Sequence, residues 1–334
     1  MTVLVAGGAG YIGSHFVRTL ADQGKPVVVI DNLSAGHADA VPDGVPLIRA
    51  SIGDRQAVRK AIEKHRPTSV VDFAGLIQVG ESVRCPDRYY GVYVVATLAL
   101  LDEVVRGGVG AFVFSSSAAV YGDPEHVPID EGHPKQPINP YGATKRIVEM
   151  AALDYGRAFR LRVACLRYFN AAGAHPDGSL AERHDPETHL VPLAIDACLG
   201  RRDPLVVFGD DWPTDDGTCV RDYIHVVDLA EAHALALDRL AATGEPLLLN
   251  LGTGHGYSVR QVIDTVGEVI GKPVPYRVGA RREGDPPKLV AAVDQAHRQL
   301  GWKAGRSDLR TIVEDAVRSR SEAGFDMGDH EATR

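Results

Sequence analysis

The chain has 334 residues, 45% of them hydrophobic and 24% charged, which is the usual composition of a soluble globular protein. Its formal net charge of −8 argues against a general nucleic-acid binder, because such a protein presents a basic surface. At this length we expect about two domains.

The cysteines and the apolar segments indicate the compartment. The four cysteines form no C-x-x-C pair and do not cluster with histidines at ligand spacing, so we expect free thiols, a reducing compartment and no metal site. The sequence begins directly with a strand pattern, which leaves no room for a signal peptide, and no apolar run approaches the roughly 18 residues of a membrane span. We therefore expect a cytoplasmic protein without membrane or nucleic-acid partners.

The first predicted elements form a phosphate-binding unit. An apolar strand at 3–6 is followed by Gly7, Gly10 and Gly13 and by a helical pattern at 11–23. Such glycines allow a tight turn, and the helix N-terminus offers unpaired N–H groups to a pyrophosphate. The alternative is a structural turn in some other βαβ unit.

A second buried strand at 27–31 favours one dinucleotide. It ends in Asp31, whose carboxylate can bind both ribose hydroxyls of an adenosine and would repel a 2′-phosphate. The unit therefore predicts NAD rather than NADP.

Strand and helix patterns then continue to alternate. Strands are expected at 46–49, 69–73, 111–115 and 162–167, and helices at 54–65, 88–107 and 141–158. Such alternation with short links is typical of an α/β fold with a doubly wound parallel sheet of the Rossmann type.

The helix expected at 88–107 is apolar over more than one face. It is either buried on both sides within the monomer, or packed on the sheet with one face and on a partner subunit with the other. We favour a symmetric homodimer formed through this helix and the one at 141–158.

A serine run and a Tyr-x-x-x-Lys spacing suit alcohol chemistry. The strand at 111–115 runs on to Ser117, and Tyr141 and Lys145 are spaced to share one helix face. A tyrosine near pKa 10 is a poor base at neutral pH, but a neighbouring ammonium and a positive nicotinamide ring would lower its pKa. With Ser117 bonded to the same substrate oxygen, this site can take a proton from an alcohol while hydride passes to NAD. Alone, Tyr-x-x-x-Lys is usually a solvated helix face.

Beyond Asn170 the pattern changes. Residues 171–190 lack periodicity and are rich in Gly, Pro and charged residues, which indicates a functional excursion. The elements expected after it are helices at 190–200, 258–270, 294–300 and 307–322, and strands at 205–208 and 247–251.

The strand at 247–251 could rejoin the first sheet, so the two domains are expected to interleave. We expect an NAD-binding domain at 1–170 with returning segments near 222–252. The smaller α/β lobe, at 171–221 and 253–334, would bind the substrate.

Nine strings of the sequence carry a family resemblance. They are Gly7–His15, Asp31–Ser34, Phe73–Leu76, Val79–Val83, Ser115–Ala118, Tyr141–Lys145, Leu166–Asn170, Asp216–His225 and Arg281–Asp285. Together they resemble the UDP-glucose 4-epimerases, which are extended short-chain dehydrogenases/reductases. The resemblance implies a tightly bound NAD and a UDP-sugar substrate, UDP-glucose or UDP-galactose. The sugar would be oxidised at C4, rotate as the 4-keto form and regain hydride on the opposite face.

The resemblance also implies roles for individual residues. Ser117, Tyr141 and Lys145 would be catalytic. Cofactor contacts are expected from Gly7, Gly10, Tyr11, Ile12, Gly13, Asp31, Asn32, Ser34, Gly36, Ser51, Ile52, Phe73, Ala74, Gly75, Ser115, Tyr141, Lys145 and Tyr168. Substrate contacts are expected from Ser117, Tyr141, Phe169, Asn170, His189, Leu190, Val206, Phe208, Arg221, Arg282, Asp285 and Leu289.

Two arginines suit a diphosphate, so Arg221 and Arg282 also fit on physical grounds. The alternative for them is a structural ion pair with Asp222 or Glu283.

Some positions depart from the family pattern. Ser51, Ile77 and Tyr93 replace polar cofactor contacts, which predicts weaker retention of NAD than in typical members. Leu289 replaces a tyrosine of stricter relatives, which predicts a roomier sugar pocket.

Ala118 and Ala119 stand where a sugar-nucleotide 4,6-dehydratase has its acid–base pair, which argues against dehydration. Two alternatives stay open. One is 4-epimerisation of another UDP-sugar, a UDP-N-acetylhexosamine or a UDP-pentose. The other is a non-catalytic regulator that responds to NAD or a UDP-sugar.

Overall fold

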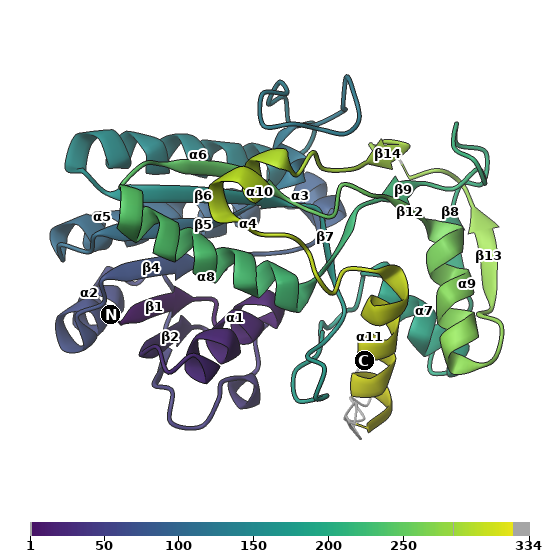
Figure 1. Cartoon of the computed structure of the whole chain (residues 1–334), viewed down its shortest axis with the longest axis horizontal. Helices are drawn as coiled ribbons and strands as arrows, with labels where there is room; N and C mark the ends of the chain where they lie inside the picture. The colour runs from purple at the N-terminus through teal and green to yellow at the C-terminus, as the bar shows by residue number, and fades with distance from the viewer. Residues whose placement is uncertain (1, 283, 323–334) are drawn as a thin grey trace.

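A seven-stranded parallel sheet organises the computed structural model, which describes residues 2–282 and 284–322 (Figure 1). The strand order is β11-β6-β5-β4-β1-β2-β3, and each neighbouring pair is parallel. The strands are β1 (Val3–Ala6), β2 (Val27–Asp31), β3 (Leu47–Arg49), β4 (Ser69–Asp72), β5 (Ala111–Ser117), β6 (Arg162–Tyr168) and β11 (Leu247–Leu251). This sheet confirms the predicted doubly wound α/β fold.

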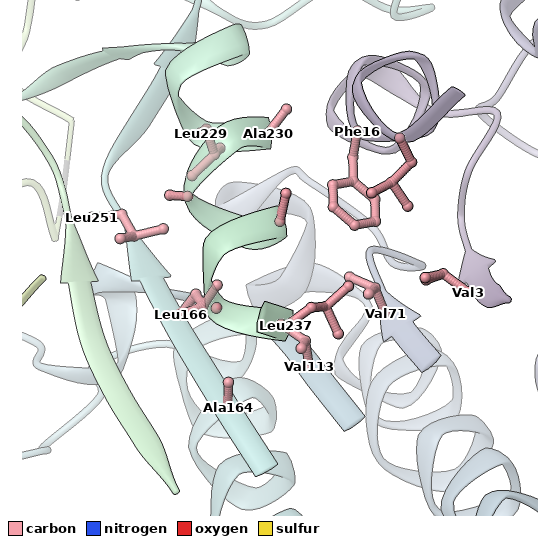
Figure 2. Close-up of a cluster of buried hydrophobic side chains, with 14 of the residues drawn as sticks. Val3, Phe16, Val71, Val113, Ala164, Leu166, Leu229, Ala230, Leu237 and Leu251 are labelled. Atoms are coloured by element: carbon pink, nitrogen blue, oxygen red, sulfur yellow. The ribbon is translucent and has the colours of Figure 1, made fainter. Parts of the chain in front are cut away.

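Helices cover both faces of the sheet, because alternate strand residues point to opposite sides. Val3 and Val5 join one buried cluster with α1 (Tyr11–Asp22) and α8 (Val226–Thr243). Figure 2 shows part of this cluster, with Phe16 of α1 and Leu237 of α8 near the strand side chains. The second cluster lies among α2 (Arg55–His65), α5 (Ala96–Arg106) and α6 (Pro140–Phe159).

A smaller group of elements lies to one side of the sheet (Figure 1). Its buried cluster is formed mainly by α7 (Leu190–Cys198), α9 (Val259–Ile270) and α11 (Leu309–Glu322). Its short strands pair as β7 (Asn170–Ala172) with β10 (Tyr223–His225), β8 (Leu205–Phe208) with β13 (Tyr276–Gly279), and β9 (Val220–Arg221) with β12 (Tyr257–Ser258) and β14 (Lys288–Leu289). Two further helices are α3 (Val79–Arg84) and α10 (Asp294–Leu300).

Two of the differences from the predicted elements concern long helices that pack on the sheet. The helix expected at 88–107 is interrupted: α4 (Pro86–Tyr89) is followed by a π-helical turn at Tyr90–Val95 and then by α5. A π-helical turn inserts an extra residue and often marks a functional site. The helix α8 was not predicted, although its residues pack on α1 and cover one face of the sheet.

Within the described residues, no helix is both long and apolar enough to span a membrane.

A buried ion pair ties α6 to the sheet. Arg167 of β6 donates to both carboxylate oxygens of Glu149 on α6, each at 2.7 Å, and both side chains are almost fully buried. Ser116 of β5 donates to the same carboxylate at 2.7 Å, and Arg167 also donates to the Tyr121 hydroxyl at 3.0 Å. The pair therefore fixes the position of α6 over the carboxyl ends of β5 and β6.

We expect Glu149→Gln to destabilise the fold strongly, because it leaves the Arg167 guanidinium buried without a charged partner. The free energy of unfolding should fall by about 3–5 kcal/mol, measured by urea denaturation. Asp154→Asn is the control, since it removes an ion pair with Arg157 on the same helix whose side chains are 70% and 75% exposed. That variant should lose less than about 1 kcal/mol. Equal losses of unfolding free energy in the two variants would show that the buried pair of Glu149 and Arg167 does not stabilise the fold in this way.

Candidate active site

Tyr141 and Lys145 lie in the first turns of α6. The helix begins cleanly there because the Asn139 side chain accepts the N–H of Gly142 at 2.9 Å and Pro140 occupies the first turn. The i and i+4 spacing places both side chains toward the end of β5, as the sequence predicts.

Lys145 is buried and held against β5. Its ammonium donates to the Ser115 carbonyl at 2.6 Å and lies 4.4 Å from the Tyr93 ring centre and 5.7 Å from that of Tyr141. Aromatic rings stabilise a cation at such distances. Lys145 is therefore fixed as a positive charge beside the Tyr141 phenol.

Burial opposes the charged forms of both groups. It lowers the pKa of Lys145 to about 8, while the Asp72 and Glu149 carboxylates act in the opposite direction. Burial also raises the pKa of Tyr141, against a lowering effect of Ser117. The lowered tyrosine pKa expected from the sequence depends on the nicotinamide ring as well as on Lys145, so it stays a prediction for the protein with NAD bound.

The serines at the end of β5 have distinct partners. The Ser115 hydroxyl forms a short hydrogen bond with the Tyr168 hydroxyl of β6. The Ser117 hydroxyl accepts the N–H of Ala119 at 3.2 Å and influences the pKa of Tyr141. Ser117 thus borders the same small space as the Tyr141 phenol.

Tyr93, one of the departures from the family pattern, enters this cluster from the π-helical turn. Its ring is almost fully buried, meets the Tyr141 ring edge-on at 5.8 Å, and its hydroxyl donates to the Leu76 carbonyl. A methyl group built on Gly75 would lie 2.3 Å from that hydroxyl. Tyr93 therefore fills space beside Tyr141 and Lys145 that only a glycine at position 75 leaves open.

The glycine turn after β1 is fixed by two close approaches. Gly7 has φ +72°, and a Cβ on it would lie 2.6 Å from the Ala74 amide nitrogen. A Cβ on Gly13 would lie 2.1 Å from the Gly7 carbonyl oxygen, which is a collision. A Cβ on Gly10 would lie 3.4 Å from the same oxygen, which is an ordinary contact. Gly7 and Gly13 are thus required by packing, and Gly10 caps α1 without a side chain over its first N–H groups.

Asp31 joins the end of β2 to this turn. Its carboxylate accepts the N–H of Ala9 at 3.0 Å and that of Leu33 at 2.8 Å. A Cβ on Gly36 would lie 2.8 Å from the Ala9 carbonyl carbon, so the loop after β2 packs directly on the turn.

Apart from Tyr141 and Lys145 on α6, the predicted cofactor residues lie at one edge of the sheet, because they end or follow parallel strands. Tyr11 and Ile12 begin α1, directly after the glycine turn that follows β1. The others are Asn32 and Ser34 after β2, Ser51 and Ile52 after β3, Phe73 and Ala74 after β4, Ser115 in β5 and Tyr168 in β6. Dinucleotides bind at this edge, where the strand order reverses between β1 and β4.

These residues fit NAD. The uncapped N-terminus of α1 suits a pyrophosphate, the glycine contacts allow its close approach, and Asp31 suits the adenosine ribose. Two of the residues that depart from the family pattern have ordinary surroundings. The Ser51 hydroxyl accepts the N–H of Gly53, and the Ile77 residue is 38% exposed. Weaker NAD retention stays a prediction.

Apart from Ser117, Tyr141 and Phe169, the predicted substrate residues lie on the smaller group of elements. In register, Arg221 of β9 pairs with Leu289 of β14. The Asp285 carboxylate receives both guanidinium donors of Arg282, at 2.9 and 3.0 Å, and lies 3.7 Å from Arg221. The alternative partner Asp222 instead accepts backbone N–H groups of Thr253, Gly254 and Ala291, and Glu283 lies outside the described residues.

Of the remaining substrate candidates, Phe208 lies beside one of these arginines, and the others have different surroundings. The Arg282 guanidinium lies 5.6 Å from the ring centre of Phe208, which is 47% exposed. Phe169 and Leu289 pack on a buried cluster around Tyr121. Asn170 begins β7, Val206 lies in β8 and Leu190 begins α7. His189 precedes α7 and faces Glu182 rather than the arginines.

Sequence reasoning missed Glu149, Arg167 and the carboxylates around His189. An arginine within an apolar strand, and a glutamate one turn beyond Lys145, were the available signals for the buried pair.

Comparisons with known proteins show the family of this chain. Residues 3–252 match the model of the NAD dependent epimerase/dehydratase family. A UDP-glucose 4-epimerase of Rhizobium meliloti is 51% identical over 94% of this chain and 95% of its own length. The crystal structure of a Brucella ovis UDP-glucose 4-epimerase in complex with NAD is 49% identical, covers 95% of this chain and 97% of its own, and has a TM-score of 0.92. The crystal structure of a Stenotrophomonas maltophila UDP-glucose-4-epimerase with bound NAD and formylated UDP-arabinopyranose is 40% identical. It covers 96% of this chain and 98% of its own, and its TM-score is also 0.92.

We expect Gly13→Ala to disrupt the turn and Gly10→Ala to leave it folded, because only the first methyl group collides with the Gly7 carbonyl. Thermal unfolding without added NAD should show a loss of about 1–3 kcal/mol for Gly13→Ala and less than about 1 kcal/mol for Gly10→Ala. A Gly13→Ala protein as stable as Gly10→Ala would show that the turn does not have this geometry.

Proposed function

The chain belongs to the NAD dependent epimerase/dehydratase family, and we propose that it interconverts UDP-glucose and UDP-galactose by NAD-dependent epimerisation at C4. The observation that carries this function is the placement of Tyr141 and Lys145 beside the serines of β5, at the sheet edge that holds the glycine turn. Alcohol oxidation needs a base and a hydride acceptor at one point, and this edge supplies the base beside the dinucleotide site.

NAD held by the glycine turn and Asp31 would supply the acceptor for the C4 hydride and the hydride for the reverse step. The phenolate of Tyr141 takes the proton of the sugar 4-hydroxyl, and Ser117 orients the same oxygen. Lys145, held by the Ser115 carbonyl, keeps a positive charge near the phenolate. When the hydride returns, the Tyr141 hydroxyl gives its proton back to the C4 oxygen.

Arg221, Arg282 and Phe208 bind the UDP group in this proposal. The two guanidinium groups now share the Asp285 carboxylate, so a diphosphate would bind to charges that are already positioned. Phe208 offers an exposed aromatic face to the uracil.

The preferred sugar is a finer question. The relative crystallised with formylated UDP-arabinopyranose keeps UDP-pentoses open as substrates. Leu289, next to Phe169 in the Tyr121 cluster, leaves more room for the sugar than a tyrosine would. The non-catalytic alternative is less well supported, because Tyr141, Lys145 and Ser117 are all retained and lie together.

A cytoplasmic homodimer is also part of the proposal. Several large apolar side chains are exposed on the two segments expected at the interface: Val95 and Tyr90 in the π-helical turn, and Ile147, Met150 and Phe159 on α6. Neighbouring apolar side chains of this kind favour association with a second copy. The mass of the protein in solution tests this assignment.

We expect Tyr141→Phe to lower the rate of conversion of UDP-galactose to UDP-glucose by about 10²–10⁴-fold, because the C4 proton loses its acceptor. Tyr155→Phe, on the same helix and bonded to Asp102 away from the site, should keep full activity. Wild-type protein that shows no conversion with NAD supplied, for UDP-galactose and for a panel of UDP-N-acetylhexosamines and UDP-pentoses, would favour the regulator instead.

We expect Lys145→Met to move the rising limb of the pH profile of kcat/KM upward by about 1–3 pH units. The reason is that the active form is the phenolate, which is present above the pKa of Tyr141, and removal of the ammonium raises that pKa. Lys64→Met on the surface of α2 is the control and should leave the limb in place. An unchanged limb in the Lys145 variant would exclude an electrostatic role for this lysine.

A further inference from the structure

Four potential metal ligands gather in the segment that leads into α7. Glu182, His184, Glu187 and His189 each contribute one nitrogen or oxygen atom, and these four atoms all lie within 4.8 Å of one another. The pattern E-x-H-x-x-E-x-H therefore folds back on itself, although the residues lie outside regular secondary structure.

The contacts converge on one carboxylate oxygen. Nδ1 of His184 lies 3.1 Å from Oε1 of Glu182 and 3.6 Å from Oε1 of Glu187. Nδ1 of His189 makes a short contact with the same Oε1 of Glu182. The two imidazole rings stand edge to face, with centres 5.2 Å apart. Both histidines thus aim their Nδ1 atoms at the same carboxylate.

Burial makes this arrangement unusual. The Glu182 side chain is 5% exposed, and those of His184 and Glu187 are each 10% exposed. Among the described residues, Nδ1 of His184 and Oε2 of Glu187 have no hydrogen-bond partner. Buried polar atoms are nearly always satisfied, so two such atoms in one cluster indicate a missing ligand.

The chemistry of the donors points to a transition metal. Two neutral imidazoles and two carboxylates balance the charge of a divalent cation, and this mixture of nitrogen and oxygen is a common zinc donor set. Magnesium and calcium prefer oxygen ligands alone. We propose that Glu182, His184, Glu187 and His189 bind one divalent transition-metal ion, with zinc as the representative case.

The position of the cluster suggests a structural role for the ion. The His184 ring meets the ring of Tyr11, in the glycine turn, edge-on at 6.1 Å. The Glu182 carbonyl accepts a hydrogen bond from Arg320 of α11 at 3.0 Å, and His189 directly precedes α7. A bound ion would therefore hold together the segment that connects the NAD turn with the substrate side.

The alternative is a metal-free cluster, in which protonated histidines pair with the two carboxylates. In that state the His184 nitrogen is close to a carboxylate without an aligned hydrogen bond. Direct metal binding separates the two possibilities, and it does so independently of the epimerase assignment because the readout is not activity.

The test begins with the full-length protein, dialysed against EDTA and then titrated with Zn²⁺ by calorimetry. One equivalent should bind and raise the melting temperature. Co²⁺ in place of Zn²⁺ should give the visible absorption of a four-coordinate site with nitrogen and oxygen ligands. Elemental analysis of the reloaded protein should find one metal ion per chain.

The matched variants are His184→Asn and Glu187→Gln, with His126→Asn as the control, because His126 forms an exposed pair with Asp130 elsewhere. The first two should weaken zinc binding by at least the 10- to 100-fold that loss of an outer-shell partner typically costs, and the control should bind like wild type. Wild-type protein that binds no Zn²⁺ and gives no visible Co²⁺ spectrum would overturn the proposal. So would zinc binding that both variants retain unchanged. If the variants fail to fold, the Co²⁺ spectrum of the wild-type protein decides.

Discussion

The buried pair of Glu149 and Arg167 is the constraint on which the active site depends. It joins α6 to β6, and through Ser116 to β5, so the helix that carries Tyr141 and Lys145 cannot shift along the sheet. Burying two charges away from water costs desolvation free energy. The two hydrogen bonds between Arg167 and Glu149, together with their further polar partners, offset this cost. The result is a phenol and an ammonium held rigidly at the strand ends where a dinucleotide binds.

The same burial creates an electrostatic problem for a tyrosine base. Desolvation favours the neutral phenol of Tyr141 and the neutral amine of Lys145, which is the opposite of what proton abstraction requires. Asp72 and Glu149 help to keep the lysine charged. The positive nicotinamide ring of oxidised NAD would add a further charge that favours the phenolate, so the proposed base should be most effective with the cofactor bound. Such coupling of cofactor binding to the basicity of Tyr141 suits a reaction in which the sugar is first oxidised and then reduced again.

The sequence predicted the sheet, the glycine turn and the placement of Tyr141 beside Lys145, because the signals for them are local spacings. Gly13 packs against Gly7, which lies close in the chain, and Tyr141 and Lys145 share a helix face whatever surrounds them. Features that depend on the tertiary structure were missed or wrong. The π-helical turn at Tyr90–Val95 breaks an apolar run that looks like one helix, and burial of Tyr141, which raises its pKa, could not be seen in the sequence. The cluster around Glu182 was not predicted, because the sequence was examined for metal sites only around its cysteines. The division into two interleaved domains stays a prediction.

The central claim is that hydride leaves C4 of the sugar and returns to the same carbon without exchange with water. UDP-galactose carrying deuterium at C4, incubated with the enzyme in ordinary water, tests it most directly. If hydride returns to the same carbon, the UDP-glucose formed retains the deuterium at C4, seen by mass spectrometry and by the missing C4 proton signal in NMR. Loss of the deuterium to solvent would contradict hydride return and require a different mechanism of inversion.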